Sequence, residues 1–153
     1  TDLYVLTNMA PIAKSIMEKA GMKVDMQSMD WQTLVARRAR RDAPDKGGWN
    51  VLITSTSGAD SLDPLTYSFI GATCDKAWFG WPCDAEITRL RDAFADETDE
   101  QKRKEIVEKL QLRAAEVPTH AFLGQYNNAM AVRKNVAGNV TSPVPIFWNI
   151  EKK

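Results

Sequence analysis

The chain has 153 residues, of which 44% are hydrophobic and 26% are charged, with 8 Gly, 7 Pro and 2 Cys. This composition excludes low-complexity, disordered, collagen-like and disulfide-dense proteins, and the length fits one soluble globular domain with its own core. Twenty basic and twenty acidic residues give a net charge of zero, which argues against nucleic acid as a partner. No apolar run approaches the about 18 to 20 residues that cross a bilayer.

The predicted elements of the first 55 residues alternate between strands and helices. Strands are expected at Leu3–Leu6, Met22–Gln27 and Trp49–Thr54. Helices are expected at Pro11–Ala20 and Trp31–Arg41. Gly21 is the stop signal of the first helix, and Asp30 is the N-cap of the second. Because this order favours parallel strands joined by crossover helices, the sequence predicts an α/β fold.

The residues beyond this pattern are predicted to form loops and helices. A helix is expected from Asp63 and Pro64 to Gly71, and another after its N-cap Asp84. The capping-box pattern Thr98–Gln101 opens a longer helix that ends at Val117 and Pro118. One or two further strands are expected within Phe122–Val132.

The C-terminal segment carries large apolar residues beside two prolines. Phe147, Trp148 and Ile150 follow Pro143 and Pro145. Such side chains need a surface to pack on, which is either the domain's own helices or a surface outside them.

The two cysteines suggest a small structural disulfide. Cys74 and Cys83 have eight residues between them, which is too wide for a Cys-x-x-Cys motif and too few ligands for zinc. If oxidised, they close a ten-residue loop worth about 2–3 kcal/mol and place the protein outside a reducing cytosol. Two unpaired thiols are the alternative.

The sequence shows no catalytic constellation, and we expect no catalytic residue, metal site or cofactor. His120 is the single histidine and no Gly-x-Ser-x-Gly motif occurs, so His120 is interpreted as a surface or hydrogen-bonded residue. Four arginines lie together on the second predicted helix: Arg37, Arg38, Arg40 and Arg41. With zero net charge, a solvated helix face is favoured over a nucleic-acid patch.

The strongest ligand-binding candidate is the loop Ser55–Asp63, which follows a predicted strand. Its candidate residues are Ser57, Gly58, Ala59 and Asp60. Open α/β sheets collect ligands at the carboxyl ends of strands, and an aspartate there can accept a charge-assisted hydrogen bond from a ligand ammonium. An ordinary turn aspartate is the alternative.

An aromatic group inside the cysteine loop is the second candidate. It comprises Trp78, Phe79 and Trp81. Core packing explains such a group most simply, and the wall of a ligand cleft, with Trp78 in it, is the alternative.

Ordered blocks of the sequence resemble a known family. They are Ile12–Val24, Met29–Arg38, Gly48–Val51, Ala59–Pro64, Ala77–Pro82, Asp84–Ile87, Gly124–Tyr126, Ala131–Val136 and Ser142–Asn149. In this order they are similar to the C-terminal part of extracytoplasmic solute-binding proteins of ABC transporters, in the dipeptide- and oligopeptide-binding class (family 5). The sequence differs from the family pattern at Ser57, where many relatives have a tryptophan shortly before the aspartate.

The resemblance implies a two-lobed clamshell of the type II periplasmic-binding-protein fold. Residues 1–153 would be a single lobe, the C-terminal one, with a mixed, mostly parallel sheet and flanking helices. Residues 133–153 would be a returning tail that packs on the missing N-terminal lobe. The chain would then be a fragment of a protein whose precursor carries a signal peptide.

The resemblance also implies a function without catalysis. Asp60 would pair with the α-ammonium of a peptide, although the class also includes receptors for nickel chelates, sugars and opines. The partners would be a peptide or small-molecule ligand and an ABC-transporter membrane permease, in the periplasm. The alternative from another class is a stand-alone α/β small-molecule-binding or regulatory domain that holds a small anion at Ser57–Ser61. A nucleic-acid adaptor is disfavoured.

Overall fold

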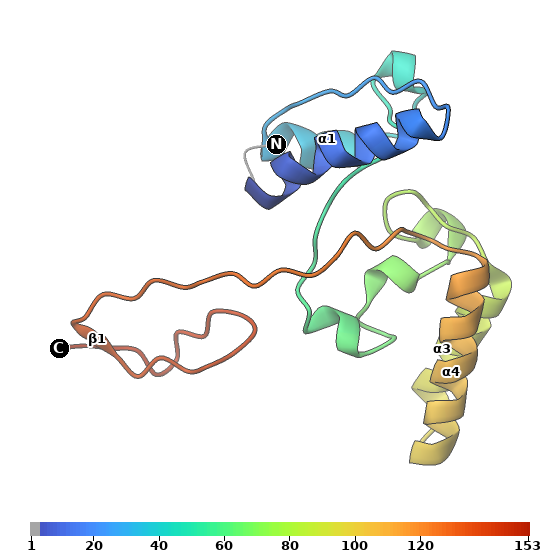
Figure 1. The fold of residues 1–153 in the computed structure, drawn as a ribbon. Helices are drawn as coiled ribbons and strands as arrows, with labels where there is room; N and C mark the ends of the chain where they lie inside the picture. Colours follow the sequence, from blue (N-terminus) through green and yellow to red (C-terminus); the bar gives the residue numbers. More distant parts are fainter. Residues whose placement is uncertain (1–3) are drawn as a thin grey trace. The chain divides into compact units, whose positions relative to one another are not determined.

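The computed structural model describes residues 4–153. The chain divides into two compact units, residues 1–55 and residues 56–153, and each is described by itself. Figure 1 shows the elements along the chain. Leu3, the first residue of one predicted strand, lies outside the described residues.

The first unit begins with helix α1 (Tyr4–Lys19). Residues 11–19 are helical as predicted, but the predicted start is wrong, because the helix begins at Tyr4 and Pro11 lies inside it. Gly21 follows its end in the left-handed conformation with φ +87°. The strand predicted at Leu3–Leu6 is wrong from Tyr4 onward, because these residues form the first turn of α1. A short apolar run fits a buried helix face as well as a strand, and Leu6 is only 2% exposed.

Helix α2 (Trp31–Arg38) has the predicted N-cap: Asp30 Oδ1 accepts a hydrogen bond of 3.0 Å from the Thr33 amide. The helix ends three residues earlier than predicted. The reason lies in the following loop, since the Arg37 guanidinium donates to the carbonyls of Gly47 and Gly48. The indole of Trp49 donates to the Arg38 carbonyl at 3.1 Å. These contacts fold the 3₁₀ turn η1 (Pro44–Lys46) against the end of α2.

The second unit opens with two 3₁₀ helices, η2 (Asp60–Leu62) and η3 (Ser68–Ile70), rather than the helix predicted from Pro64 to Gly71. The Arg91 guanidinium accounts for the difference. It donates to the carbonyls of Pro64, at 2.9 Å, and Leu65, at 3.0 Å. A continuous α-helix would use these carbonyls for its own hydrogen bonds.

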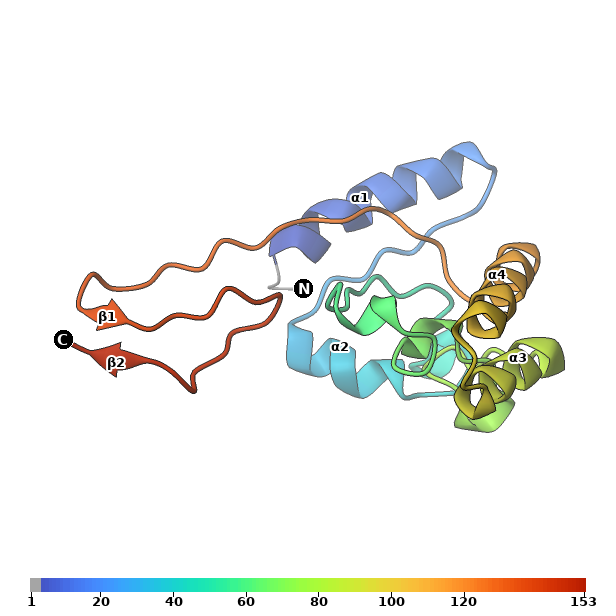
Figure 2. The ribbon, with the colours of Figure 1, turned by 90° about the horizontal axis from the view of Figure 1, so that it is seen from below.

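Helices α3 (Ala85–Asp96) and α4 (Glu100–Glu116) run side by side (Figure 2) and hold the core. The predicted N-cap Asp84 is confirmed, with Oδ1 2.8 Å from the Ile87 amide. The N-cap of α4 is Asp99, one residue after the predicted Thr98. The core comprises Ala72, Ile87, Leu90 and Leu110, with Ile70 and Ile106 packed against it.

Residues 121–135 leave α4 as an extended, exposed segment that leads to a small hairpin (Figures 1 and 2). In the hairpin, β1 (Val136–Ala137) pairs antiparallel with β2 (Glu151–Lys152). Gly138 is required here, because an added Cβ would lie 1.8 Å from the Asn149 carbonyl oxygen.

The predicted α/β class, with its mixed, mostly parallel sheet, is wrong for residues 4–153, which are mainly helical. Their one sheet is the two-stranded antiparallel pair of β1 and β2. The segments predicted as strands at 22–27, 49–54 and 122–132 are irregular. A period-2 pattern marks a segment that suits a sheet, but a strand forms only where another strand pairs with it. The alternative of a stand-alone α/β domain is wrong in its fold class for the same reason, because it also requires a parallel sheet.

Candidate ligand-binding site

The structure brings four of the predicted site residues together in one turn. The Asp60 amide donates to the Ser57 carbonyl at 3.1 Å, and the Ala59 amide donates to Ser57 Oγ at 3.2 Å. Ser61 Oγ donates to the Gly58 carbonyl at 2.7 Å. Serine hydroxyls stabilise such turns by standing in for backbone acceptors and donors. The Ser57–Ser61 segment therefore has a conformation defined by its own hydrogen bonds.

The carboxylate of Asp60 is exposed at the start of η2. Thr56 Oγ1 donates to Asp60 Oδ2 at 3.3 Å, and Thr66 Oγ1 donates to the Asp60 carbonyl at 3.0 Å. The first contact orients the side chain, and the second joins the turn to the residues before Tyr67. Since a carboxylate has about four lone-pair sites, Asp60 retains acceptor capacity for a donor from a ligand.

The predicted disulfide between Cys74 and Cys83 is confirmed, with the two Cα atoms 4.1 Å apart. Hydrogen bonds flank it: the Cys74 amide donates to the Pro82 carbonyl at 2.9 Å, and the Asp84 amide donates to the Ala72 carbonyl at 3.0 Å. Ala72 belongs to the core and Asp84 caps α3. The disulfide therefore closes a loop at a point where both ends are attached to the helical core.

Trp78, the fifth predicted ligand-binding residue, lies in this disulfide loop. Its ring meets that of Phe69 edge to face, with centroids 4.6 Å apart, and that of Phe79 at 5.1 Å. These contacts fix Trp78 against the η3 turn. The structure thus assigns Trp78 to an aromatic cluster and Asp60 to the separate Ser57–Ser61 turn, both within the second unit.

The rest of the aromatic cluster was not predicted. His120 contacts the rings of Tyr67, Phe69 and Phe122 at centroid distances of 5.7, 5.3 and 4.6 Å. The interpretation of His120 as a hydrogen-bonded residue is confirmed, since Nε2 lies 2.9 Å from Tyr67 Oη. Residues 67 and 120 are 53 positions apart, and no local pattern signals a contact at that separation.

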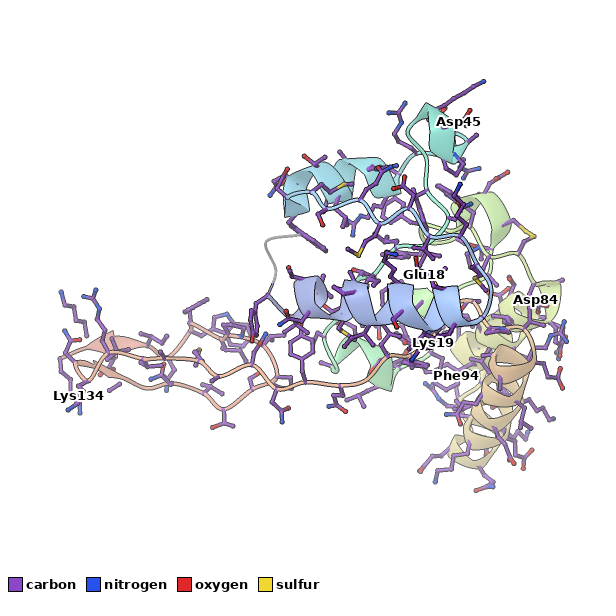
Figure 3. All side chains as sticks on the ribbon, turned by 45° about the horizontal axis from the view of Figure 1, so that its top comes forward. Glu18, Lys19, Asp45, Asp84, Phe94 and Lys134 are labelled. Atoms are coloured by element: carbon purple, nitrogen blue, oxygen red, sulfur yellow. A yellow bond between two sulfur atoms is a disulfide. The ribbon has the colours of Figure 1, made fainter. Side chains whose placement is uncertain are left out.

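A second missed interaction lies at the N-terminus of α3, where Figure 3 labels Asp84. Arg113 of α4 donates two hydrogen bonds to the Asp84 carboxylate, from Nη2 to Oδ2 at 2.7 Å and from Nε to Oδ1 at 3.3 Å. The Arg113 hydrogen bonds, followed by that from the Ile87 amide, lower the pKa of Asp84. The Asp84–Arg113 ion pair therefore joins the N-cap of α3 to α4, one residue after the disulfide cysteine Cys83.

The arginine cluster is only partly the solvated face that the sequence predicted. Arg40 and Arg41 are exposed, whereas Arg37 is half-buried and bonded to loop carbonyls. Arg37 therefore has a structural role in the first unit.

Other features of residues 4–153 do not add a site. Shallow hollows lie along α3 and α4, lined by residues such as Phe94, Arg103 and Leu112, and none of the predicted ligand-binding residues lines them. Within the described part of the chain, no three His, Cys, Asp or Glu residues are grouped to hold a metal ion. No helix there is both long and apolar enough to cross a membrane.

Comparison with known proteins gives one informative match. No family model matches the chain. A probable peptide ABC transporter periplasmic-binding protein from Sinorhizobium fredii is 28% identical over 152 residues, which are 99% of this chain and 29% of the relative. The chain thus spans less than a third of that curated relative, which is itself periplasmic by name. The match confirms the resemblance to solute-binding proteins of ABC transporters and the extracytoplasmic location.

Proposed function

We propose that the chain is the ligand-capturing lobe of a non-catalytic receptor that serves an ABC transporter and binds peptides or similar small solutes. The observation that carries the proposal is the similarity of 99% of the chain to part of a probable peptide ABC transporter periplasmic-binding protein. In such a receptor the ligand is captured between two lobes, and the closed form is presented to a membrane permease. No covalent step is needed.

Asp60 is the residue that we propose for holding a ligand ammonium. Its carboxylate is exposed, oriented by Thr56 and carried by a turn with its own hydrogen bonds. A carboxylate attracts a cation, and it disfavours the small anion that the alternative function would place at Ser57–Ser61. Fully exposed ion pairs contribute only about 0–1 kcal/mol, so strong pairing requires a second surface that excludes water. We therefore expect no saturable peptide binding by this chain alone below about millimolar concentration.

Trp78 is proposed as an apolar wall for the same ligand. The Phe69 contact holds its ring in one orientation, and the disulfide loop is attached to the core at both ends. Rigid aromatic side chains supply contact area at low entropic cost.

The second surface is proposed to be an N-terminal lobe, with residues 133–153 as the tail that packs on it. Phe147 and Trp148 are 72% and 94% exposed. Adjacent exposed aromatic residues of this size are typical of a surface that another part of the protein covers. The reading frame upstream of residue 1 tests this point: several hundred further residues behind a signal peptide are expected, and a start codon directly before Thr1 would contradict the proposal.

The role of Asp60 is tested by calorimetry on the complete protein that this gene encodes. The probes are tri-alanine with a free amino terminus and its N-acetylated form. A charge-assisted hydrogen bond is worth about 1.5–3 kcal/mol, so Asp60→Asn is expected to weaken tri-alanine binding by about 10- to 150-fold. Binding of the acetylated peptide should change little.

Asp63→Asn is the matched control. Asp63 Oδ1 accepts from the Leu65 amide at 2.7 Å, and an asparagine oxygen can accept the same hydrogen bond. This variant should bind tri-alanine like the wild type. Equal loss in the two variants, or none in Asp60→Asn, would contradict the assignment of the ammonium to Asp60.

A further inference from the structure

A chain of hydrogen bonds joins the residues after α4 to the η3 turn. Thr119 Oγ1 contacts the Phe69 carbonyl oxygen and lies 2.8 Å from His120 Nδ1. His120 Nε2 lies 2.9 Å from Tyr67 Oη. The chain therefore runs from Tyr67 through His120 and Thr119 to Phe69, and it bridges at least 50 positions of sequence.

Counting donors and acceptors shows which atom carries the hydrogen in each of these hydrogen bonds. A carbonyl oxygen only accepts, so the Thr119 hydroxyl hydrogen points to Phe69. The Thr119 oxygen must then accept from His120 Nδ1–H, which leaves Nε2 without a hydrogen in the neutral imidazole. Nε2 accepts from the Tyr67 hydroxyl. With neutral His120, every donor in the chain has an acceptor.

The surroundings of His120 favour this neutral form. The groups that face its ring are the Tyr67 phenol, the Phe69 ring and carbonyl, the Thr119 hydroxyl and the Phe122 ring. Within this set Tyr67 is the titratable group, and none of the set carries a formal charge. Burial lowers the pKa of His120, and the Phe69 carbonyl opposes this in part. Burial also raises the pKa of Tyr67, so its phenol keeps its hydrogen.

Protonation of His120 would disrupt the arrangement. The new hydrogen on Nε2 would donate to Tyr67 Oη, so the hydroxyl hydrogen of Tyr67, a residue that is 7% exposed, would lose its acceptor. A positive charge would also lie half-buried with no carboxylate in the facing set. Residues 121–135 begin here and are exposed throughout. Phe122, the first large side chain in them, stacks on Tyr67 with ring centroids 6.4 Å apart.

We propose that this chain of hydrogen bonds is a pH-sensitive latch. It holds the start of the extended 121–135 segment to the η3 turn while His120 is neutral, and it releases the segment when His120 is protonated. In a receptor lobe, release would loosen the segment that leads to the 133–153 tail. The latch does not depend on which ligand Asp60 binds, and its test requires no ligand.

The test is an NMR titration between pH 7.5 and pH 5 that follows the His120 ring, the nuclear Overhauser contacts between the Phe122 and Tyr67 rings, and the backbone mobility of residues 119–123. His120 is expected to titrate below about 6.5, the value of an unperturbed histidine. As the pH falls through the pKa of His120, the contacts between the Phe122 and Tyr67 rings should weaken and the backbone mobility of residues 119–123 should rise. The backbone mobility of α3 and α4 should not change.

Two variants separate the latch from a passive contact. His120→Gln cannot be protonated, so the contacts between the Phe122 and Tyr67 rings should no longer depend on pH. Tyr67→Phe removes the donor to Nε2 and should raise the pKa of His120, whereas Tyr126→Phe, outside the latch, should leave that pKa unchanged. A wild-type His120 pKa at or above 6.5, or the same pH dependence in His120→Gln, would overturn the proposal. The Tyr67→Phe titration tests it even if His120→Gln does not fold.

Discussion

The disulfide between Cys74 and Cys83 offers a stability prediction whose size follows from the loop it closes. Cys74 and Cys83 are nine positions apart, so the bond closes a ten-residue loop. The chain-entropy model assigns such a loop about 2.7 kcal/mol at 25 °C, all of it from restricting the unfolded chain. The hydrogen bonds beside the disulfide, from the Cys74 and Asp84 amides, do not require the sulfur atoms. The folded loop should therefore survive without the bond.

Replacing both cysteines with alanine is expected to lower the free energy of unfolding of the second unit by about 2.7 kcal/mol. Native-state hydrogen exchange of the core amides of Leu90 and Leu110 measures this value, because these amides exchange only when α3 and α4 open. Their exchange should become about a hundredfold faster. Reduced wild-type protein is the matched control and should behave like the alanine variant, since both cysteines are exposed to reductant.

Two results would refute this reasoning. A change below about 0.5 kcal/mol would mean that the loop is already ordered in the unfolded chain, so that the bond restricts nothing. Loss of all protection in α3 and α4 would mean that the bond, rather than the flanking hydrogen bonds, holds the Ala72–Asp84 region folded. The contact between Trp78 and Phe69 distinguishes the two cases, because tryptophan fluorescence should change only if the loop itself unfolds.

Two further predictions concern the same pair of helices. Leu110 is 1% exposed, so Leu110→Ala should lower the free energy of unfolding by about 2–5 kcal/mol. The control Leu112→Ala, on the same helix and 61% exposed, should lower it by at most about 0.5 kcal/mol. Similar losses for the two variants in urea unfolding would contradict the assigned core. Asp84→Asn should be less stable than the wild type at pH 6, because Arg113 lowers the pKa of Asp84 in the folded state. A carboxylate with a depressed folded pKa stabilises the fold above its unfolded value, about 3.9, and that contribution is lost as pH falls through the folded pKa. The difference should therefore shrink in acid unfolding curves below about pH 4, and a difference that grows there would contradict the role of the Arg113 pair.

The helix caps are the part of this fold that sequence predicts well. Asp30 and Asp84 each accept from an amide three residues ahead, so the whole interaction lies within one turn of chain. The pairing of Asp84 with Arg113 and of Tyr67 with His120 could not be predicted in this way, because the partners are 29 and 53 positions apart. Contacts at such separations depend on how α3, α4 and the η3 turn pack.

The strand predictions were wrong for a related reason. Met22, Val24 and Met26 alternate with polar residues, a period-2 pattern that suits a sheet face. In the structure Met22 and Met26 are 53% and 42% exposed, and residues 22–27 form no β-strand. The pattern states which side of a strand would be apolar, but it does not supply the neighbouring strand that would donate the hydrogen bonds.

The helical fold of residues 4–153 is compatible with the similarity to solute-binding proteins, because the two depend on different residues. The blocks that carry the proposed site, Ala59–Pro64 and Ala77–Pro82, lie in turns that hydrogen bonds and a disulfide define within about ten residues. Such turns keep their conformation whether or not a sheet forms beside them. A sheet, in contrast, requires strands that pair across long separations, and the one sheet within residues 4–153 is the β1–β2 pair. The local geometry of Asp60 and Trp78 is therefore defined within these turns, and the water-excluding cleft that we propose around them needs a second surface.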